Sequence, residues 1–510
     1  MRAPLLIIAV CAALLGACGD QDNTQKAEDA VTGITGGAKA PPRGTNAETL
    51  LTQAQQAANQ GRDADARATY ERAVQVFQSS GDQAGVGRAL LALATHVRTT
   101  GQGEVSRGIY ARARTAFQQA NDEAGIARVA YAVAELERAR FNNEAALAGF
   151  QEAAATFHAH ELWREEAHAL LGIADSDRRL GRIVTADGML SRARAIFEVL
   201  NDREGQQAAD RSRAELVNYV DENDRERLRL AENINYADQG GNRMLEALGH
   251  LGLGRLEALA GRPALARRAL SESRLIFAEM KLPHGEFDAW AATGDLERRL
   301  GNSDAAIEAY TRALVAFERA RDVQSHEAMT YEEGAAAPLS ERGAIAMAQR
   351  SHLEFPDAAE ARLAAARVLA GQFGPAGSGM LLLAEGWLEA RRGVPTDAAG
   401  SFAAAARTFA TADLQAEAGQ SLLAHAALAA ENNTPREAVA LYEQALAAFV
   451  AARDRLGEAE AHFGLARALV AVGESRMEAN IRYRISARLY TESDQRERAE
   501  RASAAVRTLN

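Results

Sequence analysis

Residues 94–117 read ATHVRTTGQGEVSRGIYARARTAF, and residues 134–157, forty positions further on, read AELERARFNNEAALAGFQEAAATF. In both stretches an alanine stands first, a tyrosine or phenylalanine stands seventeenth, and a phenylalanine stands last. Self-similarity at a fixed period of this size is the sequence signature of a repeat array. The sequence therefore predicts one structural unit that is repeated along the chain.

The last phenylalanine of the unit marks the repeat throughout the chain. It recurs as Phe77, Phe117, Phe157, Phe197, Phe277, Phe317, Phe409 and Phe449, with Leu489 in the same place. Sixteen residues before each of these lies a predicted turn, at Gly61, Gly101, Phe141, Gly181, Gly261, Gly301, Gly393, Asn433 and Gly473. Glycine or asparagine suits the left-handed conformation in which many helices end. Each unit is thus predicted to be a pair of helices around a turn.

Small and large residues alternate on the face that we expect to be buried. The first helix carries a small residue seven positions before the turn, at Ala94, Ala134, Ala174, Gly254, Gly294, Gly386, Ala426 and Ala466. The second carries a large one nine positions after it, at Tyr70, Tyr110, Phe150, Leu190, Leu270, Tyr310, Phe402 and Tyr442. Pro263, Pro395 and Pro435 mark first helical positions, and Thr434 with Glu437, like Thr45 with Glu48, predicts a capping box.

The pattern resembles the tetratricopeptide repeat in its A-x3-F element, seen as Ala306-x3-Tyr310, Ala398-x3-Phe402 and Ala438-x3-Tyr442. The forty-residue spacing is similar to the longer variants found in kinesin light chains. The family's tryptophan and Leu-Gly pair are mostly missing, which indicates a divergent set. The resemblance covers about residues 45–489 and implies an all-α helix-hairpin solenoid, a right-handed superhelix of about eleven repeats. It also implies protein binding in a concave groove lined by the first helices.

The predicted organisation has six parts. Residues 1–17 are a signal peptide, 18–44 a lipidated cysteine and flexible tether, 45–322 and 339–492 two parts of the array, 323–338 a longer connection, and 493–510 a capping helix. The repeat around Asp221 is degraded, because Asn233 and Ala237 replace the buried alanine and phenylalanine. In the second part the register returns near Leu353, with Ala344, Ala346, Ala358 and Ala365 in the expected buried columns.

The N-terminus predicts export and a lipid anchor. An apolar run from Leu5 to Leu15 is too short to span a bilayer and ends at Leu15-Gly16-Ala17-Cys18, which resembles the bacterial lipobox. The resemblance implies that Cys18 is diacylated and that the chain faces the periplasm. Because Gly19 stands where enteric bacteria place an aspartate retention signal, the outer membrane is favoured over the inner.

Composition and motifs exclude several kinds of function. No cysteine follows Cys18, so the mature chain has no disulfides or thiolate metal sites. The net charge is -11 and only three lysines occur, which disfavours nucleic acid. No catalytic motif is found, and His158, His160 and His168 do not share one helix face, so we predict no enzyme, metal or cofactor. The alternative is an envelope enzyme or a regulator of a peptidoglycan enzyme built on a solenoid.

A row of arginines lies three residues before the turns. It comprises Arg98, Arg138, Arg178 and Arg298, with Arg179 and Arg299 beside two of them. Two interpretations stay open: an exposed ladder of ion pairs with the nearby acids, or a groove that grips an acidic or C-terminal segment of a partner protein. Trp387 stands in a column of polar residues and is a candidate for the same groove, whereas Trp290 shares a column with leucines and is predicted to be core.

Overall fold

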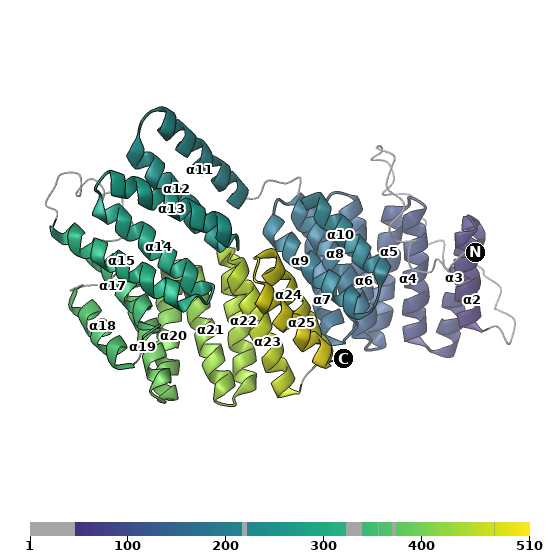
Figure 1. Ribbon diagram of the computed structural model, residues 1–510. Helices are drawn as coiled ribbons and strands as arrows, with labels where there is room; N and C mark the ends of the chain where they lie inside the picture. Colours follow the sequence, from purple (N-terminus) through teal and green to yellow (C-terminus); the bar gives the residue numbers. More distant parts are fainter. Residues whose placement is uncertain are drawn as a thin grey trace. The chain divides into compact units, whose positions relative to one another are not determined.

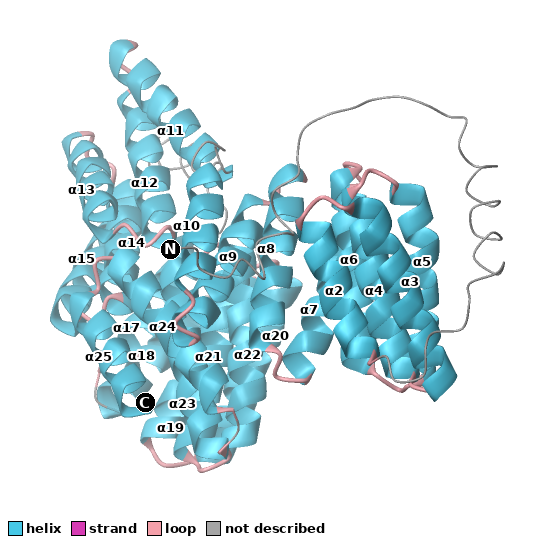
Figure 2. Cartoon of the chain, turned by 90° about the vertical axis from the view of Figure 1, so that its right-hand side faces the viewer, coloured by secondary structure: helices cyan, strands magenta, loops and turns pink. Residues whose placement is uncertain are grey.

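The computed structural model describes residues 46–216, 222–322, 339–354, 356–369, 374–473 and 475–509. These residues contain 23 helices and no strand (Figures 1 and 2). The chain divides between Leu216 and Val217 into two compact units, each of which is described by itself below. The boundary falls in the repeat that the sequence marks as degraded.

Unit 1 consists of four helix pairs and one further helix. Its helices are α2 (Ala47–Asn59), α3 (Asp63–Ser80), α4 (Gln83–Thr99), α5 (Gly103–Gln119), α6 (Glu123–Ala139), α7 (Asn143–Ala159), α8 (Trp163–Arg179), α9 (Ile183–Val199) and α10 (Arg203–Leu216). Each helix packs against the next along the chain. Successive first helices also touch, as α4 with α6 and α6 with α8, which is the arrangement of a helix-hairpin solenoid.

Unit 2 begins with α11 (Glu222–Gln239), which packs on α12. Six helix pairs follow: α12 (Arg243–Leu259) with α13 (Pro263–Glu279), α14 (Pro283–Arg299) with α15 (Ser303–Asp322), α17 (Leu339–Ser351) with α18 (Pro356–Leu369), α19 (Pro375–Arg391) with α20 (Pro395–Thr411), α21 (Gln415–Glu431) with α22 (Pro435–Ala452), and α23 (Arg455–Val472) with α24 (Arg476–Glu492). The helix α25 (Arg496–Leu509) follows and packs on α24. The all-α tetratricopeptide-type solenoid is thus confirmed.

Left-handed residues end the helices at nearly every turn. All nine predicted turn residues have positive φ, including Phe141 at 61° and Asn433 at 60°. A second set, which the sequence reasoning missed, lies at the turns that join one pair to the next: Gly81, Asn121, Glu161, Asn201, Lys281, Asp413, Arg453 and Asp494. At these described turns the helices therefore end in the same way, at one residue in the left-handed conformation.

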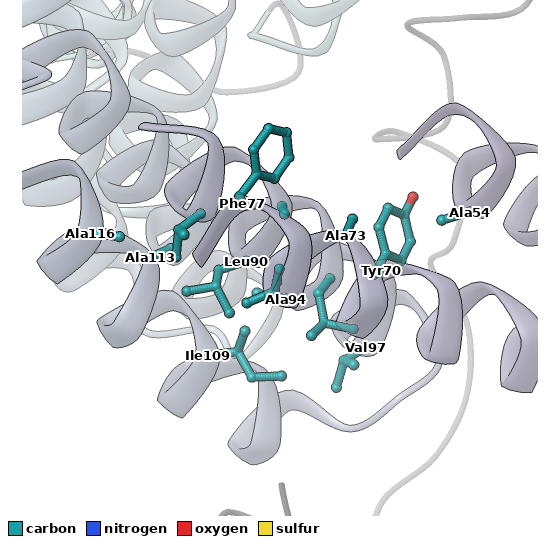
Figure 3. Packing of buried hydrophobic residues seen from close by; sticks show 14 of the residues in the cluster. Ala54, Tyr70, Ala73, Phe77, Leu90, Ala94, Val97, Ile109, Ala113 and Ala116 are labelled. Atoms are coloured by element: carbon teal, nitrogen blue, oxygen red, sulfur yellow. The ribbon is translucent and has the colours of Figure 1, made fainter. Parts of the chain in front are cut away.

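The predicted buried columns are buried. Tyr70 and Phe77 are 2% and 5% exposed, and they line one face of α3 with Ala73 between them (Figure 3). The small column lies against the large one: an added Cβ at Gly294 would come within 2.6 Å of the Tyr310 ring. Close approach of the two helices in each pair is the reason for alanine or glycine at this position.

Five further glycines lie under the phenylalanine rings, eight residues after each ring: Gly85, Gly125, Gly205, Gly285 and Gly457. A Cβ at any of them would come within about 2.3 Å of the ring of Phe77, Phe117, Phe197, Phe277 or Phe449 respectively. The phenylalanine at the end of one pair therefore packs against the first helix of the next pair. This contact joins consecutive repeats.

Several local predictions were wrong. The cap of α2 is Asn46 and not the predicted Thr45: the side-chain oxygen of Asn46 accepts a hydrogen bond from the Glu48 amide at 3.0 Å. The side chain of Thr434 makes no capping hydrogen bond to α22. Its hydroxyl donates instead to the Ala429 carbonyl of the preceding helix at 2.9 Å. The predicted helix starts at Pro263, Pro395 and Pro435 are confirmed.

The register of α18 is one residue later than predicted. In α18, Ala359, Leu363 and Ala366 are buried, whereas Ala358 and Ala365 are exposed. In α17, Ala344 and Ala346 are buried as predicted. Helix α17 ends at Ser351 and α18 begins at Pro356, so the turn holds four residues where most turns of this array hold three. The predicted connection 323–338, the signal peptide and the tether lie outside the described residues.

Candidate functional site

A groove of about 370 Å³ runs along the first helices of unit 1. Its walls come from α6, α8, α9 and α10, with Tyr131, His168, Leu171 and Leu190 among the lining residues. Three arginines of the predicted row, Arg138, Arg178 and Arg179, also line it. Arg138 and Arg178, which are forty residues apart, therefore lie on one surface, whereas Arg98 of α4 is not among the residues that line this groove.

Within this groove the arginines alternate with acids. Arg138 pairs with Glu135 of its own helix at 2.7 Å and with Asp175 of the next repeat at 3.2 Å. Arg178 repeats the pattern with Asp175 at 2.5 Å and with Glu215 at 3.8 Å. The ladder that the first interpretation expected is therefore present here, and it links α6, α8 and α10.

Asp175 is the most heavily paired acid of the ladder. Burial raises the pKa of its carboxyl, but the hydrogen bond from Arg178 and the charges of Arg179 and Arg138 outweigh that effect and hold the pKa below its ordinary value. The side chain is 20% exposed, so these charges are only partly screened by solvent. The carboxylate is thus ionised and held at neutral pH.

Arg98 differs from the other members of the row. Thr95 stands where Glu135 and Asp175 stand in the next repeats, and among the described residues Arg98 has no ion pair. Burial raises the pKa of the Tyr110 hydroxyl, and the guanidinium of Arg98 lies close enough to that group to counteract part of the rise. The Tyr110 hydroxyl lies 3.3 Å from the hydroxyl of Thr95, and the Nε of Arg98 is buried without a hydrogen bond. The first position of the row therefore carries a half-buried cation with two neutral hydroxyls beside it.

Phe141 and Arg179 lie at the edge of the groove. Arg179 pairs with Asp175 at 3.1 Å, and its guanidinium lies 5.5 Å from the centre of the Phe141 ring. Phe141 is 74% exposed, although a left-handed conformation costs a side chain such as phenylalanine ~1–2 kcal/mol. Sequence reasoning used this residue only as a turn marker and missed its exposure.

In unit 2 the corresponding arginines have a different setting. Arg298 pairs with Asp295 at 2.5 Å and donates to Gln420 of α21 at 3.1 Å. Arg299 pairs with Asp454, the residue before α23, and its carbonyl accepts a bond from Arg498 of α25 at 3.3 Å. The side chains of Arg298 and Arg299 are 17% and 10% exposed, because later repeats of unit 2 cover them.

Trp387 lines a cavity of about 220 Å³ together with Arg298 and Arg299. Its ring packs edge-on against Phe402 at 5.2 Å and lies 4.5 Å from the ring of His352. Burial, together with the charges of Arg298 and Arg391, lowers the pKa of His352 to about 3, so this histidine is neutral at physiological pH. The three predicted residues of unit 2 are therefore brought together, in a cavity walled by the unit's own repeats.

Trp290 is half-buried rather than fully buried as predicted. The guanidiniums of Arg274 and Arg312 lie 4.2 Å and 4.9 Å from the centre of its ring. Two long side chains from α13 and α15 cover the indole in place of further apolar residues.

Among the described residues no cluster of histidine, aspartate or glutamate has the arrangement of a metal site. His158 lies 3.2 Å from Glu166, whereas His160 lies 2.9 Å from Glu123, so the two histidines contact different acids. None of the described helices combines the length and apolar character needed to cross a membrane. Cys18 lies outside the described residues.

Comparison with known proteins finds similarity only to solved structures. No family model and no curated protein matches the chain. Among solved structures, the APC/C hetero-tetramer Cut9–Hcn1 is 13% identical with a TM-score of 0.34, covering 94% of this chain and 99% of that one. The TPR domain of P58(IPK) is 14% identical with a TM-score of 0.25, covering 91% and 99%. Yeast Tom70 is 16% identical with a TM-score of 0.28, covering 90% and 95%.

Proposed function

We propose that this chain is a non-enzymatic scaffold that binds segments of other proteins along the arginine row of unit 1, from Arg98 on α4 to the groove lined by Arg138 and Arg178. The observation that carries the proposal is the uneven pairing of the arginine row. Arg138 and Arg178 have acids of their own chain, whereas Arg98 has none among the described residues. A carboxylate of a bound segment would supply the missing charge.

The chemistry at Arg98 favours a carboxylate. A guanidinium forms two parallel hydrogen bonds with a carboxylate, and such bonds are about twice as strong as those between neutral groups. Burial raises the pKa of Tyr110, so its hydroxyl stays protonated and can act as a donor, as can that of Thr95. An acidic side chain or a C-terminal carboxylate of a protein segment carries this group.

The repeat geometry supports a segment rather than a small molecule. Equivalent residues recur along the first helices, so a bound chain in extended form can contact several repeats at once. Arrays of helix pairs create such extended concave binding surfaces. No cofactor and no nucleic acid is part of this proposal.

The place of this scaffold is proposed to be the cell envelope. The lipobox-like residues before Cys18 support a diacylated N-terminus, and residues 19–42 would give a tether with a reach of roughly 25–30 Å. The protein would then face the periplasm, with the outer membrane slightly favoured over the inner. Mass spectrometry of the mature N-terminus tests this: an unlipidated terminus would contradict the anchor.

The substitution Arg98→Ala tests the groove. Partners are first identified by crosslinking in cells, and their affinity for the purified full chain is then measured. We expect the affinity to fall more than tenfold, which corresponds to ~1.4 kcal/mol, because a charge-assisted bond is lost. We expect the free energy of unfolding to change by no more than ~0.5 kcal/mol, since no ion pair is broken.

Arg114→Ala is the matched control. Arg114 lies in the same repeat but on the second helix, and its ion pair with Glu152 is about half exposed. This variant is expected to bind partners like the parent chain. Equal affinity of the Arg98→Ala variant and the parent at low salt would overturn the proposal.

A further inference from the structure

Phe141 has an unusual combination of backbone conformation and chemistry. Of the eighteen described residues with positive φ, nine are glycine and eight others are polar or charged; Phe141 is the remaining one. The equivalent turns hold glycine in seven cases and Asn433 in one. A phenylalanine therefore stands where the fold favours a residue with little or no side chain.

The fold gains little from this ring. Phe141 is 74% exposed. Among the described large apolar residues, only Tyr236 at 76% and Val368 at 86% are more exposed. Its one described aromatic or cationic contact is the guanidinium of Arg179 at 5.5 Å. Strained residues that the core does not require are often found at functional sites.

The contact with Arg179 joins this ring to the groove. Arg179 lines the groove beside Arg178 and Arg138, and it is fixed by Asp175 at 3.1 Å. The Phe141 ring thus lies at the edge of the surface that carries the arginine row. A segment held in the groove can reach the ring without a rearrangement of the helices.

We infer that Phe141 and Arg179 form a rim subsite that receives an apolar side chain of the bound segment. The inference rests on the proposed function and adds the chemistry of the partner: an extended segment with a carboxylate and an apolar side chain. A partner recognised by its charge alone would not need the Phe141 ring, whereas an apolar side chain packed on the ring removes apolar surface from water. Aromatic anchors of this kind commonly dominate binding energy.

Selection from a library of random heptapeptides displayed on phage tests the proposed function and the rim subsite separately. On the full parent chain we expect enrichment of peptides that hold an acidic residue together with an aliphatic or aromatic one. With Phe141→Gly the apolar preference should disappear while the acidic preference stays. With Arg98→Ala the acidic preference should weaken.

The outcomes separate the two hypotheses. If the parent enriches no acidic peptides, the proposed function fails. If it enriches acidic peptides but the apolar preference is absent or is unchanged in Phe141→Gly, the rim subsite alone is wrong. If Phe141→Gly abolishes a concentration-dependent association seen by analytical ultracentrifugation, the ring contacts a second copy and the inference is overturned.

Stability measurements distinguish recognition from packing. For the enriched peptide, synthesised with a fluorescent label, Phe141→Gly should weaken binding at least fivefold while the melting temperature stays equal or rises. Phe141→Leu should retain most of the affinity. Asn433→Gly, at the equivalent turn of unit 2, is the control and should leave peptide binding unchanged. A lower melting temperature for Phe141→Gly would show that the ring serves the fold.

Discussion

Single residues set the distance between consecutive repeats. The phenylalanine that ends each pair lies on a glycine of the next helix where one is present, and the columns are related by forty residues like the rest of the pattern. The glycines cost the helix some stability, since Gly in a helix interior is ~0.5–1 kcal/mol worse than Ala. Their place under a ring is the compensation.

Gly125→Ala is predicted to destabilise unit 1. The new Cβ would lie 2.3 Å from the Phe117 ring, so the ring or the helix must shift, at a cost of ~1–3 kcal/mol. Gly188→Ala is the control, because that glycine also lies within a helix but nothing approaches its Cβ within 4 Å. Its free energy of unfolding should rise by ~0.5–1 kcal/mol. Urea denaturation measures both, and a stabilised Gly125→Ala would contradict the packing described.

Helices are joined in the groove by charge as well as by apolar packing. Asp175 of α8 connects to Arg138 of α6 and to Arg178 of its own helix. Because its pKa is lowered in the folded state, its contribution to stability is present above its unfolded pKa of ~3.9 and is lost as the pH falls through the folded value. The ladder is thus predicted to weaken in acid.

Asp175→Asn tests this at the level of helices. At pH 7 we expect a loss of ~1.5–3 kcal/mol, the range for hydrogen bonds to charged groups. At pH 3 the difference from the parent should be smaller, because below ~3.9 the carboxyl is protonated in the unfolded chain and its contribution to stability declines. Asp65→Asn is the control, since its pair with Arg62 is more than half exposed and is worth ~0.2–1 kcal/mol at most. A difference that is constant between pH 7 and pH 3 would reject the role given to Asp175.

The ion pairs of the ladder also decide which arginine of the row is the best one to replace. Arg138 supports Glu135, which is 6% exposed, so its removal leaves a buried acid unpaired. A variant that lacks Arg98, Arg138 and Arg178 together would mix loss of binding with loss of stability. Arg98 is the better single test because it has no acid to leave behind among the described residues.

At the scale of the whole molecule, contacts distant in sequence hold unit 2 together. Arg299 of α14 reaches Asp454, 155 residues later, and Arg498 reaches the Arg299 carbonyl across 199 residues. The turn at Gly261 also lies against Ser493. The repeats of unit 2 therefore meet across its interior, in addition to the neighbour contacts that define an array.

Arg299→Ala is predicted to loosen two distant helices together. Asp454 is 0% exposed, and removing one partner of a buried pair typically costs ~3–5 kcal/mol. Hydrogen exchange should rise in both α14 and α23. Arg229→Ala, which breaks an exposed pair with Glu226 within α11, should change exchange only near α11. Faster exchange confined to α14 would show that the contact does not hold unit 2 closed.

The sequence by itself determined the helix pairs, the turns and the buried columns of this protein. All of them depend on neighbours within one or two repeats, and a residue's place in a forty-residue period is enough to state its surroundings. The glycines under the rings and the second set of turns follow the same period and could have been found in the same way. The arginine row is periodic as well, so its alignment was predictable.

Only the tertiary structure decided what each arginine contacts. Arg138 and Arg298 occupy the same place in the repeat and each pairs with an acid three residues earlier. Arg138 also reaches Asp175 of the next repeat, whereas Arg298 meets Gln420, 122 residues further along the chain. Likewise, Phe141 and Gly181 share one turn position, but only Phe141 carries an aromatic ring, which is exposed and lies beside Arg179. The physical reason is that a repeat pattern encodes contacts between adjacent helices, whereas ion pairs across unit 2 depend on the accumulated rotation from one pair to the next.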